Sequence, residues 1–171
     1  MTGWMTKPLA WLKHQPEQRL MVILAIVVGL GSGAAAVVLK KLIELIGGCL
    51  TGWFDASWNN LLLLVYPGVG MLLSLLFVRY VVKDDIGHGV TKVLFSISRN
   101  NSRIRSHNMW SSLLSSSVTI GFGGSVGAEA PIVYTGAAIG SNVARSLGLS
   151  YRQMTILLCC GAAGAVAGIF K

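Results

Sequence analysis

The sequence predicts an all-α integral membrane protein, and two observations carry that prediction. The chain has 171 residues, of which 53% are hydrophobic and only 12% are charged, whereas a soluble domain carries about 25% charged residues. The apolar residues also gather in runs long enough to cross a bilayer, and charged residues flank these runs. The composition therefore excludes a disordered chain and an ordinary soluble enzyme. We expect no enzymatic activity and no resident cofactor.

The charge balance indicates membrane topology. The net charge is +8, which on a soluble protein would suggest a nucleic-acid partner. Here the bases flank apolar runs and do not alternate with aromatic residues, so we expect no nucleic acid. The three cysteines, Cys49, Cys159 and Cys160, do not form a disulfide framework. Cys159 and Cys160 are predicted to be small core residues, and no metal site is expected.

Two long apolar segments form the first part of the chain. Residues 20–39 carry no charge, and as a helix they are long enough to cross the roughly 30 Å bilayer core. We predict a tilted helix over residues 17–46 that ends at Gly47 and Gly48. A second uncharged run covers residues 56–78. Bases at the outer ends of this hairpin predict a cytoplasmic N-terminal lead-in over residues 1–18, followed by a transmembrane domain over residues 19–171.

The rest of the chain alternates shorter helices with glycine-rich breaks. A polar break at residues 84–90 precedes an amphipathic helix at 89–98 and a basic loop at 99–107. The hydroxyl-rich segment 109–120 is predicted to be a helix buried among other helices. Residues 121–127, with four glycines, form the second break. Helices are expected over residues 131–147 and 153–170.

Glu129 is the first candidate functional residue. It is the only acidic residue after Asp85, and an acid at membrane depth costs about 2.5–3.5 kcal/mol to insert. Pro131 suits the first turn of a helix, so Ala128, Glu129 and Ala130 are predicted at a helix N-terminus. The free N–H groups and the dipole there favour an anion, which would have to displace the carboxylate unless a proton neutralises it. The simpler interpretation is a helix-capping carboxylate or one that faces an outer vestibule.

Gly87, His88 and Gly89 form the second candidate site. Two glycines free the backbone at a predicted helix start, and His88 can donate a hydrogen bond to an anion. A capping role for His88 is an equally good interpretation. Both breaks are therefore predicted to interrupt helices, so that the helix after each break has its N-terminus facing a transport pathway.

These residues resemble a known family. Residues 123–133, GGSVGAEAPIV, resemble the G-x-E-x-P signature of CLC chloride channels and proton/chloride antiporters, and a Gly-Ser pair at 140–141 follows in register. Residues 87–91, GHGVT, are similar to the family's G-S-G-I-P, and residues 161–170 to the small-residue helix before its N-A-P. Three residues depart from the usual pattern: His88 replaces Ser, Ala128 replaces a base and Ala130 replaces Gly.

The resemblance implies an inverted-repeat fold of membrane helices, of which the chain holds the first repeat and ends inside the seventh helix. It implies a voltage-gated channel or a proton/chloride antiporter that moves chloride or another small anion. It also implies a homodimer in the lipid bilayer of the cell membrane, which we expect to be a prokaryotic inner membrane. Glu129 would gate the path and couple protons to it. The implied anion-binding residues are Gly87, His88, Gly89, Ala128, Glu129 and Ala130.

One alternative from another class stays open at this point. The chain also fits a small structural or assembly protein of the membrane without transport activity, in which Glu129 is an interhelix hydrogen-bond partner. The sequence does not separate a channel from an antiporter.

Overall fold

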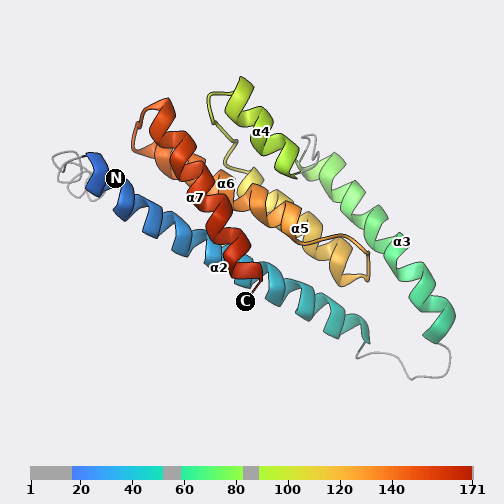
Figure 1. Cartoon of the computed structure of the whole chain (residues 1–171). Coiled ribbons are helices and arrows are strands. Elements are labelled where there is room, and N and C mark those ends of the chain that lie inside the picture. Colours follow the sequence, from blue (N-terminus) through green and yellow to red (C-terminus); the bar gives the residue numbers. More distant parts are fainter. Residues whose placement is uncertain (1–16, 52–58, 83–88, 171) are drawn as a thin grey trace, which may run out of the picture.

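The computed structural model describes residues 17–51, 59–82 and 89–170, and every regular element in these ranges is helical. In Figure 1, α5 and α6 lie between α2 and α3, α4 packs on α6, and α7 crosses α2 and α6. The predicted all-α fold is confirmed. The elements are α2 (Glu17–Thr51), α3 (Asn59–Phe77), the π-helical turn η1 (Val78–Val82), α4 (Gly89–Arg99), α5 (Asn108–Gly121), α6 (Glu129–Ser146) and α7 (Tyr151–Ile169).

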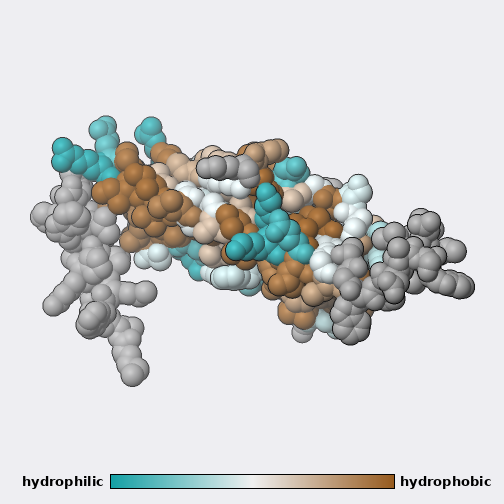
Figure 2. Space-filling view, turned by 90° about the horizontal axis from the view of Figure 1, so that it is seen from below, coloured by the Kyte–Doolittle hydropathy of each residue, from teal (hydrophilic) through white to brown (hydrophobic). Residues whose placement is uncertain are grey.

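Among the described residues, three helical stretches are long and apolar enough to cross a membrane, namely Glu17–Leu50, Val65–Val82 and Tyr151–Ile169. Their outer surfaces carry exposed apolar side chains such as Leu30 and Leu72. Figure 2 shows apolar residues spread over large areas of one face of the molecule. Soluble monomers rarely expose contiguous apolar surface on this scale. The prediction of a membrane protein is therefore confirmed.

Glycines set the packing of α6 against α7. A Cβ atom added to Gly136 would overlap the carbonyl oxygen of Gly161, and one added to Gly161 would overlap the carbonyl oxygen of Gly136. One turn along, Gly140 meets the backbone of Leu157 in the same way. The two antiparallel helices thus meet backbone to backbone. In a bilayer, where lipid tails are as apolar as leucine, such close van der Waals contact holds helices together.

The other face of α7 packs on α2 through the same kind of residue. A Cβ atom on Gly164 would lie 2.9 Å from the Cα atom of Gly29, and one on Gly168 would lie 3.1 Å from the Cα atom of Gly33. Gly164 and Gly168 are four residues apart on α7, and Gly29 and Gly33 are four residues apart on α2. This spacing places the two glycines of each helix on one face. Helix α7 is therefore held between α2 and α6. The largest fully buried apolar side chains also come from these three helices: Val28, Leu39, Ile132, Leu157 and Leu158.

A tight turn joins α6 to α7. Gly148 adopts a left-handed φ of 65°, which glycine enters without strain. Its N–H donates to the carbonyl oxygen of Arg145, and the N–H of Leu149 donates to that of Ala144, both at 3.1 Å. These two bonds are the Schellman pattern that closes helix C-termini. The turn reverses the chain so that α7 returns along α6.

The predicted basic segment after α4 is a loop fixed by α6. The Oγ of Ser141 donates to the carbonyl oxygen of Ser102 at 2.6 Å and accepts from the N–H of Ile104 at 3.0 Å. The hydroxyl of Ser106 donates to Asn142 Oδ1 at 2.7 Å. This loop therefore lies at the C-terminal end of α6, at the opposite end of that helix from Glu129.

One predicted boundary is wrong. Helix α2 does not end at Gly47 and Gly48 but continues to Thr51. Ile46 packs on Gly121 at the end of α5, and Gly47 faces the same residue. These tertiary contacts outweigh the low helix propensity of glycine. Most of the predicted lead-in, residues 1–16, and residues 56–58 of the second predicted span lie outside the described residues.

We predict that Gly136→Ala destabilises the protein, because the new methyl group would overlap a backbone oxygen that cannot move aside. Overpacking of this kind costs about 1–3 kcal/mol. Gly29→Ala is the matched control, since a Cβ atom there meets nothing within 4 Å. Thermal unfolding of the purified protein in detergent checks the prediction. Equal midpoints for the two variants would contradict the backbone contact.

Candidate functional site

The glycine-rich loop before α6 turns the chain sharply. Gly123 has a φ of 84°, in the left-handed region that favours glycine. The N–H of Gly124 donates to the carbonyl oxygen of Thr119 at 3.0 Å, and a Cβ atom on Gly124 would lie 2.6 Å from that oxygen. The chain can follow this path only without side chains at these points. The predicted break at residues 121–127 is confirmed, with Gly121 still inside α5.

Helix α6 begins at Glu129 with exposed backbone donors. Its N-cap residue, Ala128, has no side-chain capping bond, and Pro131 contributes no N–H group. Within the part of the chain that the structure describes, the N–H groups of Ala128, Glu129 and Ala130 have no acceptor. Free donors together with the positive end of the helix dipole make this end of α6 attractive to an anion.

The carboxylate of Glu129 folds back toward the loop. A Cβ atom on Gly127 would overlap Oε2 of Glu129 and would lie 3.5 Å from its Cδ atom. The side chain is exposed, and none of the salt bridges or hydrogen bonds among the described residues involves it. The carboxylate therefore lies beside Gly127, just before the first turn of its own helix, without a hydrogen bond to the N–H groups of that turn. This position suits either a capping group or a group that competes with a bound anion.

The start of α4 contacts the start of α6. A Cβ atom on Gly89, the first residue of α4, would overlap the carbonyl oxygen of Ala130 and would lie 3.4 Å from the Cβ of Tyr134. The structure thus brings together four of the six predicted anion-binding residues: Gly89, Ala128, Glu129 and Ala130. The other two, Gly87 and His88, lie outside the described residues.

A buried hydrogen bond supports this contact. The Nδ2 of Asn108, at the start of α5, donates to the hydroxyl of Tyr134 at 2.8 Å, and both residues are buried. Val93 of α4 packs in the same apolar cluster as Tyr134. Sequence reasoning missed this support, although one signal was available. Tyr134 is the only aromatic residue of α6, and a buried tyrosine usually has a partner for its hydroxyl.

The described residues contain no group of three histidine, cysteine or acidic side chains that could hold a metal ion. The prediction that Cys159 and Cys160 are core residues is wrong for Cys159, which is exposed because no described helix covers its side of α7, while Cys160 is half-buried. Cys49 is exposed as well, and all three thiols are free. Within the described residues, the candidate site combines backbone N–H groups at two helix starts with one carboxylate.

We predict that Gly89→Ala separates the starts of α4 and α6, because the methyl group would overlap the backbone at Ala130. The expected cost is about 1–3 kcal/mol, which lowers the midpoint of thermal unfolding. Gly68→Ala serves as control, because a Cβ atom on Gly68 meets nothing within 4 Å. If Gly89→Ala unfolds no earlier than Gly68→Ala, the two helix starts are not in contact.

Comparisons with known proteins agree with these features. A family profile described as voltage gated chloride channel matches residues 69–171, which is more than half of the chain and includes all of α4 to α6. The uncharacterised protein MJ0305 of Methanocaldococcus jannaschii is 28% identical over 148 residues. That match covers 86% of this chain and 33% of the relative, so the chain spans about a third of the length of the curated relative it matches. No solved structure matches the chain. With Glu129 and the two helix starts inside the matched region, the chain belongs to the voltage-gated chloride channel family.

Proposed function

We propose that the protein moves a small anion, chloride by default, across the membrane, and that Glu129 gates the path. Family membership supports the transport class, and one geometric observation carries the assignment of the site. The first turns of α4 and α6 touch at Gly89 and Ala130. Two converging helix N-termini offer backbone donors and positive dipole ends from two directions. Such an arrangement favours an anion over a cation.

In the proposed mechanism, the Glu129 carboxylate competes with the transported anion. While charged, it occupies the space in front of the N–H groups of Ala128, Glu129 and Ala130. An anion enters that space when it displaces the carboxylate, or when a proton neutralises it. Displacement alone gives a gated channel, whereas obligatory protonation gives a proton/chloride antiporter. No bond to the anion is made or broken, so we propose no enzymatic step.

The orientation and assembly belong to the same proposal. Arg145 in the last turn of α6 and the basic loop beside it mark the cytoplasmic end, following the positive-inside rule. Glu129 begins the same helix, about 24 Å away at 1.5 Å per residue, and therefore faces the outer side. We place the protein in the cell membrane as a homodimer with a cytoplasmic N-terminus. His88 keeps its predicted role as a donor to the anion beside Gly89.

We predict that Glu129→Gln uncouples anion flux from protons or opens the path. The test reconstitutes the intact protein in liposomes with a chloride gradient and records chloride and pH together. In an antiporter, the wild type moves protons in the direction opposite to the chloride flux, and the variant moves chloride alone. In a channel, neither moves protons and the variant conducts chloride several-fold faster, because the competing charge is gone. Glu44→Gln, on the exposed side of α2, should behave as the wild type.

Two results would contradict the proposal. If Glu129→Gln keeps the flux and the pH dependence of the wild type, Glu129 is not the gate. If no small anion moves in either protein, the transport function itself fails, and the structural or assembly role of the protein becomes the better explanation.

We predict that Gly127→Ala changes gating without removing the carboxylate. The added methyl group would take the space that Oε2 of Glu129 occupies. Because that atom is the free end of a flexible side chain, the carboxylate can swing away and the fold can survive. We expect an unchanged unfolding midpoint and a several-fold higher chloride flux at neutral pH. A flux equal to that of the wild type would show that the backfolded carboxylate does not block the path.

A further inference from the structure

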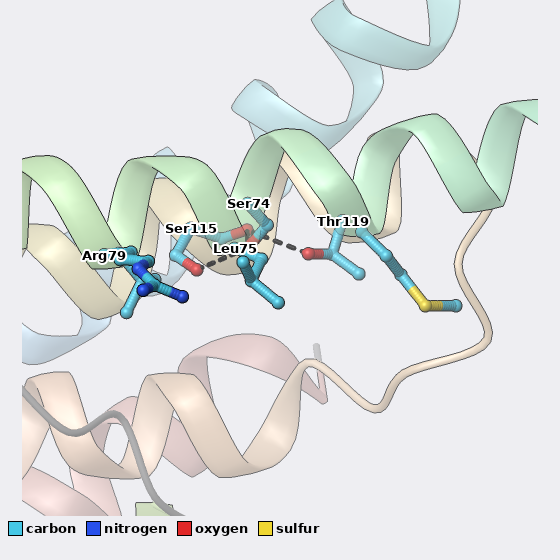
Figure 3. A pocket seen from close by; sticks show the side chains of 7 residues that line it. Ser74, Leu75, Arg79, Ser115 and Thr119 are labelled. Carbon is cyan, nitrogen blue, oxygen red and sulfur yellow. Dashed lines mark hydrogen bonds between the residues drawn. The ribbon is translucent and has the colours of Figure 1, made fainter.

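An open pocket of about 490 Å³ lies between the α3–η1 segment and α5. Of the candidate anion-binding residues that the structure describes, none lines it. The pocket combines three apolar side chains, three hydroxyls and one arginine (Figure 3). In Figure 3, Arg79 stands at one end of the row of labelled side chains and Thr119 at the other, with Ser74, Leu75 and Ser115 between them.

The hydroxyls form a connected group at the base of the pocket. The Oγ atoms of Ser74 and Ser115 lie 2.7 Å apart, and Ser74 also lies within bonding distance, 3.2 Å, of the Ser115 carbonyl oxygen. Thr119 donates to that same carbonyl oxygen at 3.1 Å. Ser74 and Ser115 are buried. The pocket thus has a polar floor to which α3 contributes Ser74 and α5 contributes Ser115 and Thr119.

Arg79 supplies the only charge among the described residues that line the pocket. It is exposed, and it is the one charged residue in α3, η1 and α5. No ion pair of Arg79 occurs within the described residues. It stands near the end of the apolar stretch Val65–Val82, which is the depth of lipid headgroups. A guanidinium binds a phosphate through two parallel hydrogen bonds.

The apolar part of the lining completes the pattern. Met71, Leu75 and Val78 continue from Arg79 toward the middle of the span. Only 6% of the Val65–Val82 stretch is buried among the described residues, so the pocket opens on the outer surface of this apolar stretch. A free inorganic anion would leave this apolar wall without a partner. A zwitterionic headgroup would bring a cation for which neither α3, η1 nor α5 offers a carboxylate.

We propose that this pocket binds an anionic glycerophospholipid. Its phosphate lies on Arg79, its ester oxygens lie over the hydroxyls of Ser74, Ser115 and Thr119, and an acyl chain follows Met71 and Leu75. The site is separate from the proposed anion path, so its test does not depend on transport.

The test measures lipid binding to the intact protein in detergent. Delipidated protein is titrated with phosphatidylglycerol or with phosphatidylcholine, and bound lipid is counted by native mass spectrometry. Arg79→Gln should weaken binding of phosphatidylglycerol about tenfold, the effect of losing one charge-assisted bond pair. Arg99→Gln removes the same charge from an exposed position at the end of α4 and should change binding less than twofold. Arg79→Lys keeps the positive charge but lacks the planar guanidinium group. Its affinity for phosphatidylglycerol should lie between those of the other two variants.

A second variant tests the pocket rather than the charge. Ser74→Leu fills the polar floor and keeps Arg79, so it should also weaken binding of phosphatidylglycerol while the unfolding midpoint shows that the protein is folded. If Arg79→Gln and Arg99→Gln weaken binding of phosphatidylglycerol equally, the lipid is attracted to basic residues in general. That result would overturn the proposed site. Equal binding of phosphatidylcholine, or displacement of the lipid by inorganic phosphate, would overturn the assignment to an anionic lipid.

Discussion

The backbone contact between α6 and α7 at Gly136 and Gly161 is the constraint on which the rest of the structure depends. Inside a bilayer the hydrophobic effect does not draw helices together, since lipid tails solvate apolar side chains as well as a neighbouring helix does. Van der Waals contact between closely packed helices is the attraction that remains, and the helices approach most closely where side chains are absent. Gly164 and Gly168 extend the same principle to α2. Three helices are thereby fixed relative to one another.

The candidate site follows from this constraint. Because α7 holds α6 in place, the start of α6 has a fixed position, and the buried bond from Asn108 to Tyr134 ties the start of α5 to it. Gly89 then brings α4 against the first turn of α6. In the proposed site, backbone donors held on rigid helices would need no reorganisation to meet an anion, which is the property that preorganised sites require. The stretch Val65–Val82, in contrast, is mostly exposed.

Much of the helix pattern could be predicted from the sequence, because glycine breaks and charged flanks bound each apolar segment. The end of α2 could not, since it depends on the contact of Ile46 with Gly121, which lies far along the chain. Glu129 stood out as an acid in an apolar region, and its place at a helix start followed from Pro131. The contact between Gly89 and Ala130 could not be predicted from the sequence, because it depends on how α4 packs on α6.

The pocket on α3 was also invisible in the sequence. Ser115 and Thr119 were interpreted as helix-packing hydroxyls. Taken singly, Ser74 and Arg79 show nothing in the sequence that points to a pocket. Only the packing of α3 on α5 places them together.

The central claim is that an anion binds where the starts of α4 and α6 converge, in competition with Glu129. Crystals of the intact protein soaked in bromide test it directly, because anomalous scattering locates the ion. The account predicts a bromide within hydrogen-bond distance of the N–H groups of Ala128 to Ala130, stronger in Glu129→Gln than in the wild type. Bromide bound elsewhere, with none at this helix start in either protein, would contradict the account.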